Sequence, residues 1–299
     1  MIIVWGLLQN ILEEGLIYGF MAMGVYITYK ILDFPDLSVD STFPMGACVT
    51  AVLIRAGVNP WLAMLLALAS GMAAGALTGV LHVKLKITDL LSGILVMTAL
   101  ISVNLVITGG TSVLAYYNMP TIFNSGIINY LPDGLRPYRV LLLLTVLAIG
   151  VKLALDGYLT TRSGLLLRAA GDNPQFVTAL GKNPGNRKIL GLAIGNGCTA
   201  FAGSILSQQA ESANINMGLG MVVMGLASVI IGTSIFRRLR WMRATTMAIL
   251  GAILYKFSLS VAMQLGLPTT YLKLLMAVIL TVALVTNRVT LKGGKKTHG

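Results

Sequence analysis

The sequence predicts an all-α protein whose helices cross a membrane in about nine segments. Hydrophobic residues make up 56% of the 299 residues and charged residues only 11%, whereas soluble domains carry roughly 25% charged residues. The apolar residues also stand in stretches close to the roughly 20 residues that a membrane-crossing helix needs. We therefore expect a single transmembrane domain over 1–299, with no room for a soluble domain.

The candidate membrane segments follow an N-terminal stretch, 1–14, which we place at the outer interface. They are 15–31, 37–54, 61–83, 90–107, 140–155, 189–207, 219–235, 242–263 and 271–285. Pro44 and Gly46 interrupt 37–54, and Gly225 and Gly232 interrupt 219–235. Broken helices at corresponding places of two halves are typical of transporters with an inverted repeat. Gly-rich helices that simply pack closely explain the same pattern.

The basic residues predict how the chain lies in the membrane. With the N-terminus outside, most Lys and Arg fall in cytoplasmic segments, chiefly the loop 161–188, the loop around 237–243 and the tail 286–299, and only Arg55, Arg136 and Arg139 lie outside. This bias favours N-out, C-in. It also accounts for the net charge of +12, and because the basic residues form no aromatic-interleaved patch we expect no nucleic-acid binding.

The polar loop 161–188 is the most informative segment between two spans. Asn173 and Pro174 predict a helix start, as N-cap and first helical residue, and Gly181 predicts its end. The helix has only about two turns, too short to be stable alone, so we expect it to dock on another protein; a turn that packs on its own bundle is the alternative. The predicted docking residues are Asn173, Pro174, Gln175, Phe176, Val177, Ala179, Leu180 and Gly181.

The stretch 32–47, LDFPDLSVDSTFPMGA, carries Asp33, Asp36 and Asp40 beside a membrane segment. A charged side chain at the bilayer centre costs roughly 2.5–3.5 kcal/mol, so we expect these carboxylates at an interface or in a wet cavity. Pro35 and acids in a first helical turn suit a capped helix start. The alternative is a border of a translocation path, formed by Ser38, Asp40, Ser41 and Thr42.

Polar residues within other spans are further candidates for that path. They are Thr98, Asn104 and Asn196. Hydrogen bonds between helices explain such residues equally. With only two histidines, at 82 and 298, the sequence offers no catalytic or metal site within the membrane.

Three segments, in order along the chain, carry a resemblance to a known family. Residues 36–41, DLSVDS, resemble the DLSVGS segment of bacterial ABC permeases for ribose, other monosaccharides and branched-chain amino acids. Residues 168–188 are similar to their cytoplasmic loop of form R-x-x-G-x-N-x-x-A-x-x-x-G-I-x-x-x-x-x-K, and 270–282 are similar to their closing helix. The chain departs at Asp40, where the family has Gly, and at Lys182, where it has Ile.

The resemblance is closest to compact permeases paired with lipoprotein-type binding proteins, some of which carry aromatic amino acids. It implies a type II-like importer fold with an inverted repeat in a bacterial cytoplasmic membrane. It also implies a second copy of the chain, two cytoplasmic ATPases and an extracytoplasmic binding protein. The chain has no phosphate-binding loop, since Gly294–Thr297 lies in a basic tail with no strand before it. We therefore expect no enzymatic activity and no bound cofactor, with ATP used by the partner subunit.

The resemblance favours import of a small polar solute, an amino acid in particular, aromatic or branched-chain. A permease for a sugar or nucleoside is an alternative. An ion-coupled secondary transporter is another, but it would need buried carboxylates as relays, and the predicted spans are nearly free of Asp and Glu away from their ends.

Overall fold

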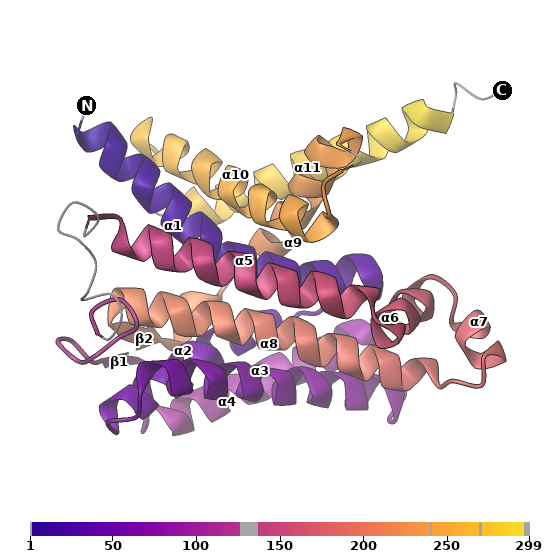
Figure 1. Ribbon diagram of the computed structural model, residues 1–299, viewed down its shortest axis with the longest axis horizontal. Coiled ribbons are helices and arrows are strands. Elements are labelled where there is room, and N and C mark those ends of the chain that lie inside the picture. Colours follow the sequence, from indigo (N-terminus) through magenta and orange to yellow (C-terminus); the bar gives the residue numbers. More distant parts are fainter. Residues whose placement is uncertain (1, 126–136, 240, 269–270, 296–299) are drawn as a thin grey trace.

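The computed structural model describes residues 2–125, 137–239, 241–268 and 271–295. It is a bundle of long helices (Figure 1). The first part of the chain forms α1 (Ile2–Val25), which continues as the π-helical turn η1 (Tyr26–Ile31), then α2 (Val39–Arg55), α3 (Pro60–Val83), α4 (Asp89–Ile107) and the short strand β1 (Val113–Ala115). The middle part forms α5 (Arg139–Thr160), α6 (Arg162–Asp172), α7 (Pro174–Ala179) and α8 (Pro184–Ala210). The last part forms β2 (Ser212–Asn214), η4 (Ile215–Gly218), α9 (Met221–Ile235), η5 (Phe236–Arg238), α10 (Ala244–Gln264) and α11 (Leu272–Lys295).

The prediction of a helical membrane protein is confirmed. Within the described residues, seven helical segments are long and apolar enough to cross a bilayer: Trp5–Ile31, Pro60–Val83, Asp89–Ile107, Arg139–Thr160, Pro184–Ala210, Ile215–Ile235 and Ala244–Gln264. α2 is 17 residues long and the apolar part of α11, Leu274–Val285, is shorter still. The predicted number of nine is therefore not confirmed by length and composition.

The first helix begins earlier than predicted. Residues 2–14 are helical and continuous with the first span, so they do not form a separate interfacial stretch. The two acids that suggested an interface have partners inside the bundle. Glu13 accepts hydrogen bonds from Gln9 (2.8 Å) and Gln209 (3.0 Å), and Glu14 pairs with Lys256.

The helix contacts repeat in two halves, α1–α4 and α8–α11. α1 packs against α10 as α8 packs against α3, and the pairs α2–α3 and α2–α4 recur as α9–α10 and α9–α11. α1 and α8 contact each other and run in opposite directions (Figure 1). This arrangement is an inverted repeat, with the two broken segments of the sequence, α2 and α9, in equivalent positions.

α8 lies at the centre of the bundle and contacts α1, α2, α3 and α6. Its neighbours approach closely because they present glycines. A Cβ at Gly75 of α3 would collide with the carbonyl oxygen of Leu192, and one at Gly46 of α2 would collide with the backbone of Ala200. Small residues thus let the backbones meet, as in other membrane bundles.

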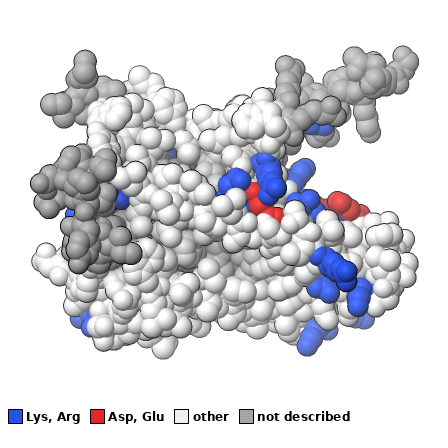
Figure 2. Space-filling view, in the orientation of Figure 1, with Lys and Arg blue, Asp and Glu red and all other residues white. Residues whose placement is uncertain are grey.

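The two ends of the bundle differ. One end carries the antiparallel pair β1–β2, in which Leu114 faces Ala213, and the beginning of α1. The other carries α6 and α7 and the C-terminal end of α11 (Figure 1). Basic side chains gather at this second end (Figure 2). Arg136 and the side chains of the tail 286–299 lie outside the described residues.

Candidate functional site

A buried polar cluster forms where the connection 32–38 enters the bundle. The Asp36 carboxylate accepts hydrogen bonds from the Ser38 backbone N–H (2.9 Å), from Ser38 Oγ (2.6 Å) and from Asn196 Nδ2 (2.6 Å). Thr78 Oγ1 donates to Ser38 Oγ at 3.4 Å. All four residues are buried, so the cluster joins the start of α2 to α3 and α8.

Asp33 and Asp36 were both expected at an interface or in a wet cavity, and the structure places them in different surroundings. Asp33 is exposed, as expected for an acid at an interface. Asp36 is only 4% exposed, so it does not border a wet cavity. Three hydrogen-bond donors of the protein replace water around its carboxylate. Burial raises the pKa of the Asp36 carboxyl above its usual range, and the hydrogen bonds from Ser38 and Asn196 only partly oppose that shift.

Asp40 lies in the first turn of α2 but caps a different helix. Its carboxylate accepts hydrogen bonds from the backbone N–H of Val222 (2.8 Å) and Gly220 (3.2 Å), at the start of α9. The N-cap of α9, Gly220, has no side chain to do this and adopts φ +91°. Asp40 is also the acid in the first turn of its own helix, as predicted, but α2 begins at Val39 and not at Pro35, and its N-cap Ser38 makes no side-chain cap bond. Asp40 ties together the two broken helices of the repeat.

Most of the remaining residues predicted to border a path make hydrogen bonds between or within helices. Asn104 of α4 donates to the Ser41 carbonyl at 3.0 Å, and Thr42 donates to the Ser38 carbonyl at 2.9 Å. These residues are buried. Thr98 stands apart, exposed on α4 with its hydroxyl bonded to Ile94 of its own helix. The structure thus gathers all these residues except Thr98 around α2.

The short helix α7 has the predicted limits. Asn173 Oδ1 accepts from the Phe176 N–H at 3.1 Å, Pro174 is the first helical residue, and Gly181 ends the turn with φ +68°. Its apolar residues divide between two faces. Val177 is fully buried against its own chain, whereas Phe176 and Leu180 are 54% and 52% exposed. The expected apolar side is therefore split, with one anchor turned inward and two outward.

Gln175 and Ala179 add to the exposed side of α7. The preceding helix, α6, was not predicted. The residue that could have predicted its start is Thr161, the N-cap, whose Oγ1 accepts a hydrogen bond from the Gly164 N–H at 3.2 Å. α6 docks on the bundle at Gly171, where a Cβ would collide with the carbonyl oxygen of Ile31. Through α6, the position of α7 depends on the end of α1.

Comparison with known proteins decides the family. The model of the family described as the permease component of branched-chain amino acid transport systems matches residues 7–284. The chain belongs to this family. The resemblance found in the sequence is thereby confirmed.

Relatives of this permease are named for different solutes. It is 40% identical, over 94% of its own length and 92% of the relative's, to the tyrosine transport system permease protein of Clostridioides difficile (strain R20291). It is 32% identical, over 93% and 96%, to an uncharacterized protein of Rickettsia prowazekii (strain Madrid E). It is 28% identical, over 75% and 68%, to the ribose import permease protein of Escherichia coli (strain K12). No solved structure gives a significant match.

Proposed function

We propose that this permease is the membrane-spanning subunit of an ATP-driven importer for an amino acid, with tyrosine as the first candidate. The observation that carries the energy coupling is α7. Its backbone is held by caps at both ends and by Val177 in the bundle, yet it presents Phe176 and Leu180 to the outside. Exposed apolar anchors on a fixed helix fit the helix-in-groove mode of protein recognition.

The partner at α7 is a cytoplasmic ATPase. This ATPase binds and hydrolyses the ATP, and we assign no cofactor to the permease itself. Two copies of the permease form the channel of the importer. An extracytoplasmic binding protein, anchored as a lipoprotein, delivers the solute to the opposite end, where β1 and β2 lie. The family match supports this division of labour, because its model describes one component of a transport system.

The solute passes beside α2 in this proposal. Asp40 is the half-buried member of the predicted path, and it also holds the start of α9. Asn104 Oδ1 is buried and, within the described part of the chain, has no hydrogen-bond partner. The other buried members shape the path by holding α2 against α4 and α8: Ser38, Ser41, Thr42 and Asn196. Thr98 faces away from them, toward lipid or the second copy.

The choice of solute rests on similarity. The relative named for tyrosine transport matches nearly the whole chain, and an amino acid is therefore favoured. A sugar is the second candidate, because the relative named for ribose import matches three quarters of it.

The function is tested by uptake into proteoliposomes. We expect radiolabelled tyrosine to enter only when the permease, its cognate ATPase, ATP and the binding protein are all present. Ribose serves as the parallel solute. Uptake by the permease alone, driven by an ion gradient, would replace the proposal with secondary transport, and ATP-dependent uptake of ribose without tyrosine would replace the solute.

The orientation, with the N-terminus outside and the C-terminus in the cytoplasm, is tested by thiol labelling. Ser112, before β1, and Asn186, early in α8, are both exposed and lie near opposite ends of the bundle. The native Cys48 and Cys198 are buried, which keeps the background low. In intact cells Ser112→Cys should react with an impermeant reagent and Asn186→Cys should not. The reverse pattern would invert the assignment.

A further inference from the structure

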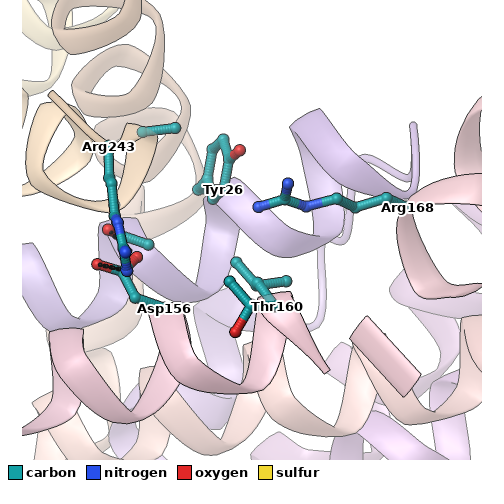
Figure 3. A pocket seen from close by; sticks show the side chains of 8 residues that line it. Tyr26, Asp156, Thr160, Arg168 and Arg243 are labelled. Atoms are coloured by element: carbon teal, nitrogen blue, oxygen red, sulfur yellow. Dashed lines mark hydrogen bonds and ion pairs between the residues drawn. The ribbon is translucent and has the colours of Figure 1, made fainter. Parts of the chain in front are cut away.

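A cleft of about 350 Å³ lies between η1, α5, α6 and the start of α10, outside the residues assigned to transport or coupling. It is lined by Tyr26, Asp156, Leu159, Thr160, Arg168, Arg243, Ala244 and Thr245. Arg168 and Arg243 enter it from opposite sides, with Tyr26 and Thr160 between them (Figure 3). Its volume falls in the range of about 300–1,000 Å³ that is usual for small-molecule sites.

The cleft carries an excess of positive charge. Asp156 Oδ2 pairs with Lys152 Nζ at 3.0 Å and with Arg243 Nη1 at 3.3 Å, while Thr245 donates to Asp156 Oδ1 at 2.6 Å. One carboxylate therefore faces two cations. Arg168 makes no ion pair with any residue in the described part of the chain, and its guanidinium adds a third cation. The excess is available to an anion from outside.

The cleft lies at the level where the membrane segments end. The candidate span that contains Tyr26 ends at Ile31, the α5 span ends at Thr160, and the α10 span begins at Ala244. Trp241, just before α10, is 81% exposed, and tryptophan is enriched at membrane–water interfaces. A ligand in the cleft would therefore sit at the depth of lipid headgroups.

We propose that this cleft binds the phosphate of an anionic phospholipid headgroup. Arg168 and Arg243 contact the phosphate, since a guanidinium matches phosphate oxygens with paired hydrogen bonds. The hydroxyl of Tyr26 lies beside Arg168 as a further donor, whereas the hydroxyl of Thr160 donates to the Gly157 carbonyl at 2.7 Å. A free phosphate has the same chemistry, but a lipid reaches this depth with its acyl chains still in the bilayer. Basic pockets between transmembrane helices bind anionic headgroups in this way.

The test measures lipid binding to the purified full-length permease by native mass spectrometry. The probes are dioleoylphosphatidylglycerol, dioleoylphosphatidylcholine and millimolar inorganic phosphate. The wild type should bind phosphatidylglycerol in preference to phosphatidylcholine. Arg168→Gln should weaken phosphatidylglycerol binding about fivefold, the effect of one cation near an anionic lipid. It should leave thermal stability unchanged, because Arg168 holds no described partner.

The matched control is Arg162→Gln, which removes an exposed arginine from the same helix but outside the cleft. It should bind phosphatidylglycerol as the wild type does. Equal binding by wild type and Arg168→Gln would overturn the proposal, as would inorganic phosphate that stabilises the protein as strongly as the lipid. Loss of ATPase co-purification with unchanged lipid binding in Arg168→Gln would also overturn it, by showing that the cleft faces the ATPase.

Discussion

The cluster around Asp36 and the helix α7 differ in where their side chains find partners. In the cluster, the carboxylate of Asp36 and the side chains of Ser38 and Asn196 satisfy one another inside the bundle. In α7, the caps satisfy the backbone, but Phe176 and Leu180 remain exposed. The difference teaches that conspicuous polar residues within this membrane domain hold helices together, whereas the apolar residues of α7 stay exposed, which is the basis of the contact that we propose with the ATPase.

The largest effect should come from the buried cluster. Asn196→Leu keeps the side-chain volume but leaves the Asp36 carboxylate without one of its donors. Because a hydrogen bond to a buried charged group is worth about 1.5–3 kcal/mol, we expect the unfolding free energy to fall by about 3 kcal/mol, measured by denaturant unfolding in detergent micelles. Thr98→Val is the control, since Thr98 is exposed, and should change it by less than about 0.5 kcal/mol. Equal losses in the two variants would end the distinction between buried and exposed polar groups.

The second prediction concerns α7. Phe176→Ala should weaken association with the ATPase by about 2 kcal/mol, roughly thirtyfold, which is typical of a buried interface aromatic. Ala179→Asp should weaken it at least as much, because it places an unpaired charge in the same interface. The measurement is co-purification in detergent, together with the melting temperature of the permease alone.

The control for α7 is Gln175→Ala, an exposed polar residue on the same helix, which should retain the ATPase. Neither Phe176→Ala nor Ala179→Asp should change the melting temperature, because both side chains point outward. If both variants keep the ATPase at wild-type levels, or if the permease itself loses stability, α7 is a structural turn and has no coupling role.

The smallest effect is expected at Asp40, which combines features of the two regions. It is half-buried, and it caps α9 from α2. Asp40→Ala should lower stability by about 1 kcal/mol, the usual cost of losing an N-cap, and should reduce uptake because the start of α9 is released from α2. Asp40→Asn keeps an acceptor oxygen and should lose less of both. Wild-type uptake and stability in Asp40→Ala would show that the contact is dispensable.

Much of α7 was predictable because its signals are local. Asn173, Pro174 and Gly181 each act on backbone groups within a few residues, and the structure has the predicted cap and turn at those positions. The inward position of Val177 was not predictable. Which face of so short a helix is buried depends on where α6 and α8 lie, and that is set by contacts far along the chain.

The start of the first helix was missed for a similar reason. Glu13 and Glu14 suggest an interface when read with their neighbours alone. Their partners, Gln209 and Lys256, come from α8 and α10, 196 and 242 residues further on. Once those partners are in place, the acids fit within a continuous helix.

The sequence by itself determined that the chain is a helical membrane protein of this permease family, with a capped helix in the loop 161–188. The helical membrane class follows from composition and hydrophobic length, the family follows from the resemblance of 36–41, 168–188 and 270–282 to known permeases, and the cap follows from signals between neighbouring residues. Only the tertiary structure decided that Asp36 is buried by Asn196 and that Asp40 caps α9, pairings that span 160 and 182 residues. A carboxylate's role depends on which donors surround it, and here the packing of distant helices supplies most of those donors.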